Sequence, residues 1–138
     1  ISRYQRRLSG PLMDRIDLFV DVPRVPFEKL SGLSGGEKSE AVRERVARAR
    51  QVQSGRFDGS PGHTTAQMTP PQVRDFAQRQ LADGAGDVLK LAVERLNLSA
   101  RAFHRLLKVA RTIADLADSD GIETPHMAEA IQYRARIE

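Results

Sequence analysis

The stretch from Ser99 to Ala117 constrains the fold of this 138-residue chain more than any other. Apolar side chains recur there at spacings of three and four residues, while basic residues occupy another face. Ser99 stands directly before the pattern, in the position of a helix N-cap. We therefore expect an amphipathic helix with one face buried in a helical domain. Its apolar side chains are Phe103, Leu106, Leu107, Ala110, Ile113, Ala114 and Ala117.

Further helices are predicted on both sides of this one. Thr69-Pro70-Pro71-Gln72 combines a cap, a proline in the first turn and a glutamine three residues after the cap, which predicts a short helix. Other helices are predicted over about 86–96 and about 124–136. Residues 69–138 are thus expected to form a bundle of about four helices. The side chains expected to face inward in the two other helices are Leu89, Val93, Leu96, Ala128, Ile131 and Ala135.

The first part of the chain has a different pattern. Apolar and polar side chains alternate over residues 16–22, and prolines follow at positions 23 and 26, which predicts a strand. A lone strand cannot make a sheet, so we expect its partners upstream, in a longer protein from which this chain is a fragment. Residues 1–26 are interpreted as a short remnant of an α/β domain. The predicted fold class is therefore mainly α, a helical bundle preceded by that remnant.

Residues 27–68 are predicted to be a linker with one helix and one flexible loop. Ser34 and Glu37 have the spacing of a capping box, and a helix over residues 37–53 follows. Glycine and proline are frequent in residues 54–68, which is typical of a flexible loop. The helix has a thin apolar stripe, formed by Val42, Val46 and Ala49.

Composition and motifs exclude several kinds of site. The chain has no cysteine, which excludes disulfides, thiolate metal ligands and cysteine nucleophiles. The three histidines are scattered without carboxylates at ligand spacing, so no metal site is predicted. No run approaches the roughly 18 apolar residues of a membrane span, and no signal peptide is visible. We expect a cytoplasmic protein without a membrane partner.

Two glycine-rich patterns around residues 32–39 resemble nucleotide-binding loops. Leu33-Ser34-Gly35-Gly36-Glu37 matches the signature loop of ABC-type ATPases, but no apolar strand ending in Asp-Glu follows it. A phosphate-binding loop needs contiguous Gly-Lys-Ser/Thr after a buried strand, and here Glu37 interrupts the pattern. A flexible linker with a capping box is the favoured interpretation.

Arginine dominates the charge of the chain. The formal net charge is +4, and 18 of the 22 basic residues are arginines. Arginine favours bidentate contacts with phosphate, so a phosphate-bearing partner such as DNA fits, although genome composition can give the same ratio. Arg15 lies between Asp14 and Asp17, and we expect these carboxylates to hold its guanidinium at a domain edge. The alternative is a surface ion pair of about 0–1 kcal/mol.

Several segments resemble one protein family. Ser9–Asp17 is similar to the Ser-Gly-Pro-Leu-Leu-Asp-Arg-Ile-Asp motif of the magnesium-chelatase-like AAA+ ATPases of the ComM/YifB type. Leu98–Arg105 resembles their Leu-Ser-Ala-Arg-Ala-Tyr-His-Arg segment, and Ala110–Leu116 matches the Ala-Arg-Thr-Ile-Ala-Asp-Leu that follows it. His126–Arg134 is also similar. The resemblance covers nearly the whole chain.

This resemblance implies that residues 1–26 end an AAA+ core and that residues 69–138 form its helical lid, with the helix over 37–53 inserted between them. It implies that Arg15 is an arginine finger and that Arg101 is a sensor-2 residue that contacts nucleotide phosphate. The parent protein is then an ATPase that uses ATP and Mg²⁺ and assembles with itself into a ring, as a hexamer.

The resemblance also implies a role in DNA processing, such as branch migration during natural transformation or recombination. Metal insertion into a porphyrin would need partner subunits that nothing in the sequence indicates. Walker A and Walker B motifs are missing from the chain, so it is predicted to be inactive as an ATPase alone.

A second hypothesis comes from a different class of function. The chain would be a helical module that binds DNA or protein through Arg101, Arg105 and Lys108, without any role for a nucleotide. No base-reading motif is present, so such DNA contacts would be made to phosphates and would weaken with salt.

Overall fold

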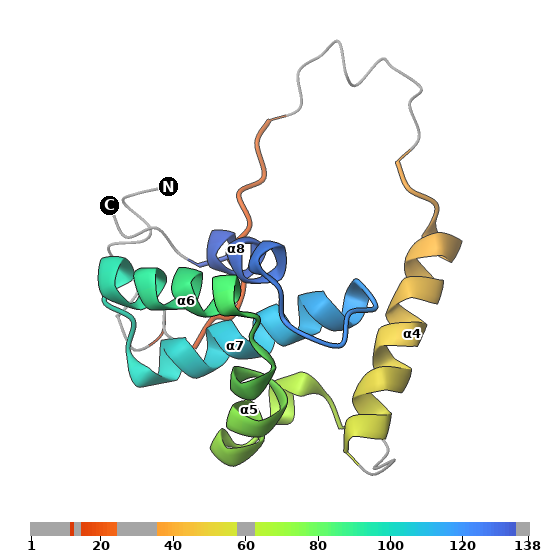
Figure 1. Cartoon of the computed structure of the whole chain (residues 1–138). Coiled ribbons are helices and arrows are strands. Elements are labelled where there is room, and N and C mark those ends of the chain that lie inside the picture. Colours follow the sequence, from red (N-terminus) through yellow and green to blue (C-terminus); the bar gives the residue numbers. More distant parts are fainter. Residues whose placement is uncertain (1–11, 13–14, 25–35, 58–62, 135–138) are drawn as a thin grey trace.

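The computed structural model in Figure 1 describes residues 12, 15–24, 36–57 and 63–134, and over these residues the fold is mainly α-helical, as predicted. In these ranges the only strand-like pairing is an isolated parallel bridge between Leu81 and Ile122. The elements in chain order are α4 (Ser39–Arg56), the 3-10 helix η1 (Thr65–Gln67), α5 (Pro70–Phe76), the 3-10 helix η2 (Gln78–Gln80), α6 (Asp83–Leu96), α7 (Ala100–Leu116) and α8 (Thr124–Gln132).

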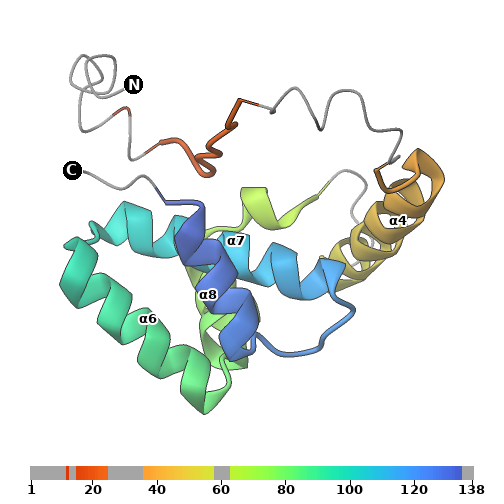
Figure 2. The same ribbon diagram turned by 90° about the horizontal axis from the view of Figure 1, so that it is seen from above.

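Helix α7 forms the centre of the bundle, and α4, α5, η1 and α8 pack against it, while α6 packs against α8 (Figures 1 and 2). The side chain of Ser99 accepts a hydrogen bond from the amide of Ala102 at 3.1 Å, which confirms the predicted N-cap. The predicted apolar face is also confirmed at its centre, where four side chains are fully buried. These are Leu106, Leu107, Ala110 and Ala114.

The other helices follow local signals, with shifted boundaries. The capping box of Thr69 and Gln72 at the start of α5 is confirmed. Helix α6 begins three residues earlier than predicted, because Ala85 is fully buried and continues its inner face. Helix α8 ends at Gln132 instead of near Arg136. Its fully buried side chains are Met127 and Ala130, whereas the predicted Ala128 and Ile131 are only partly buried and Ala135 lies outside the described residues.

The strand predicted over residues 16–22 is wrong. Residues 15–24 run as an extended segment past α7 and α8 without strand assignment (Figure 2). Leu18, Val20 and Val22, which are apolar side chains of that alternation, are all exposed. The physical reason is that a strand needs a hydrogen-bonded neighbour, and the described part of the chain supplies none. The segment is instead tied to the end of α8, where the Phe19 amide donates to the Tyr133 carbonyl at 2.8 Å.

Helix α4 lies at the edge of the bundle in both views (Figures 1 and 2). It begins at Ser39, after Lys38 as N-cap, and not at residue 37, so the predicted role of Glu37 in a capping box is wrong; its proposed partner Ser34 lies outside the described residues. Of the predicted apolar stripe only Ala49 is buried, because α4 touches α7 along one narrow face.

The loop predicted over residues 54–68 is ordered over much of its length. Helix α4 continues through Arg56, the next residue Phe57 is buried, and η1 follows with a buried Met68 after it. Phe57 packs edge-on against Phe76 of α5, with ring centroids 5.9 Å apart, so this segment belongs to the core. Residues 58–62 lie outside the described residues. Among the described helices, none is long and apolar enough to cross a membrane.

Candidate functional site

Three of the four predicted site residues line one surface pocket of about 370 Å³ on the N-terminal half of α7. We call this the basic pocket, because its charged groups are Arg101, Arg105 and Lys108, with Asp17 at its edge. The helical spacing of these basic residues places them on one side of α7, and η1 and α5 supply the facing wall. The other lining residues are Ala66, Met68, Pro70, Val73 and His104.

Arg101 lies in the first turn of α7 and is exposed at the mouth of the basic pocket. Within the described part of the chain, its guanidinium has no hydrogen-bond or ion-pair partner. The positive end of the α7 dipole lies at the same end of the helix. A free guanidinium in this position has its full capacity for bidentate contacts with a phosphate.

Arg105 is engaged by the chain itself. Its guanidinium forms a hydrogen-bonded ion pair with the carboxylate of Asp17, 88 residues away in the sequence. Asp17 was expected to hold Arg15, and that prediction is wrong: the described residues contain no contact between the side chains of Arg15 and Asp17. Because Arg105 lies on the ordered helix α7 within reach of Asp17, the Asp17 carboxylate pairs with Arg105. Asp14, the other expected partner of Arg15, lies outside the described residues.

Lys108 is the third basic residue that lines the basic pocket. Its Nζ atom donates a hydrogen bond to the Ala66 carbonyl in η1 at 2.8 Å. Burial lowers the pKa of Lys108 from its ordinary value, and the nearby Arg105 acts in the same direction, while Asp17 opposes them. The Lys108 ammonium therefore already has one partner and is less free than Arg101 to bind an incoming anion.

Arg15 lies apart from the basic pocket and is exposed. Its amide donates to the Leu12 carbonyl at 3.0 Å in a turn, and its guanidinium has no partner among the described residues. The segment after it is fastened to α8, because Arg134 donates to the Ile16 carbonyl at 3.3 Å and Phe19 bonds to Tyr133. The structure thus places Arg15 on a tethered segment, outside the pocket lining that Asp17 of the same segment joins.

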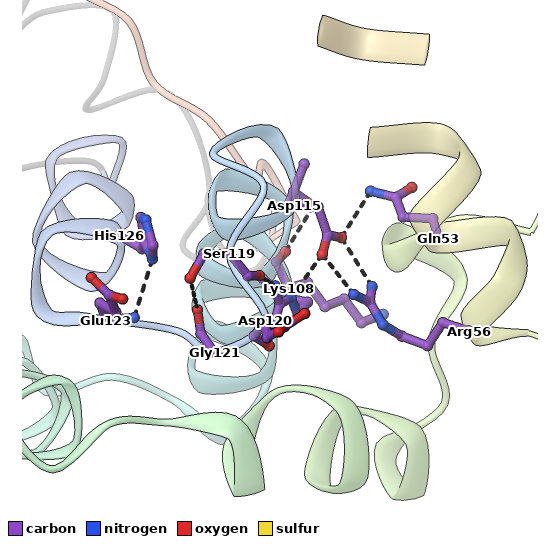
Figure 3. A network of polar contacts seen from close by, with 11 residues as sticks. Gln53, Arg56, Lys108, Asp115, Ser119, Asp120, Gly121, Glu123 and His126 are labelled. Atoms are coloured by element: carbon purple, nitrogen blue, oxygen red, sulfur yellow. Dashed lines mark hydrogen bonds and ion pairs between the residues drawn. The ribbon is translucent and has the colours of Figure 1, made fainter. Parts of the chain in front are cut away.

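A second polar cluster lies at the other half of α7, and the sequence analysis missed it. Figure 3 shows Gln53 and Arg56 of α4 directed toward Asp115 of α7. Arg56 contacts both carboxylate oxygens of Asp115, at 2.9 and 2.6 Å, and Gln53 Nε2 donates to Oδ2 at 3.3 Å. Arg111 Nε donates to Oδ1 of the same carboxylate at 2.9 Å. We call these four residues the buried ion cluster.

Arg111 is the largest fully buried side chain in the described structure, and each of its three guanidinium nitrogens donates a hydrogen bond. Besides Asp115, it donates to the carbonyls of Asp120 at 2.8 Å and Ser119 at 2.6 Å, which fixes the turn between α7 and α8. Burial lowers the pKa of Arg111, and the Asp115 charge opposes this effect. The Arg111–Asp115 spacing of four residues in the middle of an apolar face was the signal that could have revealed the cluster.

The two clusters differ in what they can do chemically. The buried ion cluster links Gln53 and Arg56 of α4 to Asp115 of α7, so its role is to join α4 to α7. The basic pocket has one free guanidinium, one ammonium, one paired guanidinium and a single carboxylate that Arg105 already occupies. This set of groups fits an anion such as a phosphate and does not fit a metal ion, because Asp17 and His104 are its only carboxylate and imidazole side chains and the described residues hold no group of three or more His, Asp or Glu side chains placed for a metal.

Comparison with known proteins finds two matching family models and several related proteins. Residues 36–134 match the family model described as "Magnesium chelatase, subunit ChlI C-terminal", and residues 1–30 match "Magnesium chelatase, subunit ChlI". Competence protein ComM of Haemophilus influenzae is 42% identical over 139 residues, which cover 99% of this chain and 26% of that protein.

Two further relatives show the same pattern of coverage. The uncharacterized protein YifB of Escherichia coli is 42% identical over 134 residues, or 96% of this chain and 25% of YifB. An uncharacterized protein of Mycobacterium bovis is 35% identical over 134 residues, or 96% of this chain and 26% of the relative. The chain spans about a quarter of the length of these relatives. Because one family model covers most of the chain and the identity reaches 42%, the chain belongs to the magnesium-chelatase-like family that includes ComM and YifB.

Proposed function

We propose that this chain is the C-terminal part of a magnesium-chelatase-like AAA+ ATPase and supplies two arginines for ATP hydrolysis in a ring oligomer. Arg101 serves as the sensor-2 residue of its own subunit, and Arg15 serves as the arginine finger for the next subunit. The observation that carries the proposal is the exposed guanidinium of Arg101, which has no partner among the described residues and lies in a pocket whose other groups fit a phosphate.

The surroundings of Arg101 support the sensor-2 role. Arg105 and Lys108, on the same side of α7, are held by Asp17 and by the Ala66 carbonyl, while Arg101 keeps all of its donors available among the described residues. Helix α7 is rigid at this end because Ser99 caps it and because its inner face is buried. A rigid, exposed guanidinium can move with the lid and contact phosphate when the lid closes over nucleotide.

The place of Arg15 supports a role in a neighbouring subunit. Arg15 does not line the basic pocket of its own chain, and it is exposed on a segment tethered to α8. An arginine finger supplied to another subunit must project from the surface and neutralise the charge that develops on the γ-phosphate. Such an arrangement requires a closed ring, which we propose is a hexamer.

ATP and Mg²⁺ are the cofactors that the proposed reaction needs. The basic pocket fits a phosphate of ATP, and Arg101 is the residue that would hold it. The pocket does not fit Mg²⁺, because its one carboxylate is paired with Arg105. We propose that Mg²⁺ and the phosphate-binding loop are held by the ATPase core of the longer protein, and that this chain alone does not hydrolyse ATP.

DNA processing is the role we propose for the motor. The name of the relative from Haemophilus influenzae, a competence protein, supports a task in natural transformation, and the net charge of +4 suits a polyanion. We propose that the ring moves DNA branches in transformation or recombination, and that its DNA contacts are to phosphates. The alternative is a nucleotide-independent module that binds DNA through Arg101, Arg105 and Lys108. It has less support, because only Arg101 has an unpaired guanidinium in the described pocket.

The proposal is tested by ATP hydrolysis of the full-length protein with Arg15→Ala. We expect the turnover number to fall by about 10³- to 10⁵-fold while the ring still assembles, as measured by size-exclusion chromatography with light scattering. Arg24→Ala is the matched control, because Arg24 is another exposed arginine on the same segment. Wild-type turnover by an assembled Arg15→Ala ring would refute the finger role.

A second measurement separates the motor from the binding module. Arg101→Ala in the full-length protein should weaken ATP hydrolysis, whereas Arg95→Ala, an exposed arginine at the end of α6, should leave it unchanged. DNA binding by the 138-residue chain at two salt concentrations tests the alternative. Tight, salt-sensitive DNA binding by the chain, combined with normal ATP hydrolysis by Arg101→Ala, would favour the binding module.

A further inference from the structure

The Asp17–Arg105 ion pair stands at the edge of a pocket that otherwise has only cationic and neutral groups. The carboxylate comes from the segment that carries Arg15, and the guanidinium comes from α7. A carboxylate and a phosphate make the same kind of bidentate contact with a guanidinium, so they compete for one partner. Asp17 therefore holds a place that an anionic ligand of the pocket would use.

We propose that Asp17 is a built-in competitor for the anion of the basic pocket, so that phosphate binding breaks the Asp17–Arg105 pair and loosens the residues next to Arg15. The inference rests on the proposed function and deepens it, because it links occupancy of the sensor-2 pocket to the segment that bears the finger. The ligand chemistry is a phosphate or polyphosphate group.

The exposure of the pair makes the exchange easy. The side chain of Asp17 is 48% exposed and that of Arg105 is 28% exposed, so water and salt already screen their attraction. A phosphate group carries more charge than a carboxylate and meets Arg101 and Lys108 as well as Arg105. The pair is therefore weak enough for a phosphate to displace it.

Other hydrogen bonds of residues 15–24 determine which residues become mobile when the Asp17–Arg105 pair is lost. The Phe19 amide is bonded to the Tyr133 carbonyl at 2.8 Å, and this contact involves no group of the basic pocket. Among the described residues, loss of the Asp17–Arg105 pair would therefore leave residues 15–17 held to the helices only by the Arg134 hydrogen bond to the Ile16 carbonyl at 3.3 Å, while residue 19 stays attached to the end of α8. The Arg15 side chain would then be able to extend further from the surface while the basic pocket of its own subunit is occupied by phosphate.

The experiment measures inorganic pyrophosphate binding to the 138-residue chain at low salt by ¹⁵N NMR titration. We expect Asp17→Asn to bind pyrophosphate more tightly than wild type by up to about five-fold, the worth of an exposed ion pair. Asp21→Asn is the matched control, because it removes the same charge from an exposed position on the same segment, outside the pocket lining. Arg101→Ala confirms the location of binding by weakening it.

The amide signals of the segment provide a second readout. On saturation of the wild-type chain with pyrophosphate, the Arg15 and Ile16 amides should sharpen as they become mobile, and the Phe19 amide should keep its protection from exchange. Equal affinities of Asp17→Asn and Asp21→Asn, with binding that still depends on Arg101, would overturn the competitor role and leave the proposed function standing. Absence of pyrophosphate binding by wild type and all variants would overturn both.

Discussion

The two charged clusters of α7 lie on one helix and differ in nearly every physical respect. In the buried ion cluster, the side chains of Arg111 and Asp115 are 1% and 0% exposed, and each nitrogen of the Arg111 guanidinium has an acceptor. In the basic pocket, Arg101 is exposed without a partner among the described residues, and Arg105 shares one half-exposed carboxylate. One half of the helix is therefore committed to structure, and the other half keeps capacity for a ligand.

The difference shows that charge alone does not identify a site. Arg111 has the same chemistry as Arg101, but its burial requires that its charge and donors be satisfied within the protein, which leaves nothing for a ligand. The exposed groups lose little by staying unpaired in water, so they can exchange partners. Substitutions in the two clusters should therefore differ in the size of their effect and in its dependence on salt.

The largest effect is expected for Asp115→Asn. The change leaves the buried charges of Arg111 and Arg56 without a counter-ion, so the free energy of unfolding should fall by about 3–5 kcal/mol, as measured by urea denaturation. Asp87→Asn, at an exposed position on α6, is the control and should change the stability by less than about 0.5 kcal/mol. Equal stability of the two variants would mean that the cluster does not hold the fold together.

Features that depend on neighbours in sequence could be predicted. The Ser99 cap, the capping box of Thr69 and the centre of the apolar face of α7 are set by residues within one or two helical turns, and all three are confirmed, whereas Ala117 at the end of the predicted face is exposed. The family resemblance, which gave the family correctly, rests on such contiguous motifs too.

Features that depend on distant partners could not be predicted. The partner of Asp115 on α4, Arg56, is 59 residues away, and the partner of Arg105, Asp17, is 88 residues away. Nothing local in the sequence indicates either pairing. The strand over residues 16–22 failed for the same reason, since alternation is a local signal but a strand exists only with a neighbour. The roles of Arg15 and Arg101 stay predictions.

A smaller effect is expected for Arg56→Gln, which loosens the α4 side of the buried ion cluster. Asp115 keeps its bond with Arg111, so only the joint between the helices weakens, by about 1–3 kcal/mol. Hydrogen exchange should accelerate in α4 more than in α6, because α4 contacts the bundle along one narrow face. Arg48→Gln, an exposed position on α4, is the control. Uniform acceleration across all helices would show that α4 does not open independently.

The Ser99→Ala variant tests the N-terminal end of α7, where Arg101 of the basic pocket also lies. Loss of the cap should lower the free energy of unfolding by about 1 kcal/mol, measured by thermal denaturation, because the Ala102 amide loses its acceptor. Ser99→Asp keeps a capping oxygen and should retain most of the stability. If Ser99→Asp is as unstable as Ser99→Ala, the hydrogen bond is not the source of the effect.

The smallest effect, and the sharpest contrast between the clusters, is expected for Asp17→Asn. The Asp17–Arg105 pair is exposed, so its loss should lower the free energy of unfolding by no more than about 1 kcal/mol at low salt. At 1 M salt the Debye length shrinks to about 3 Å, and the difference from wild type should vanish. The loss in Asp115→Asn should persist at the same salt, because ions do not reach a fully buried carboxylate. If the free energy of unfolding lost in Asp17→Asn did not depend on salt, the Asp17 carboxylate would have a structural role like that of Asp115. A phosphate could then not displace Asp17 from Arg105, and the proposed competition in the basic pocket would be wrong.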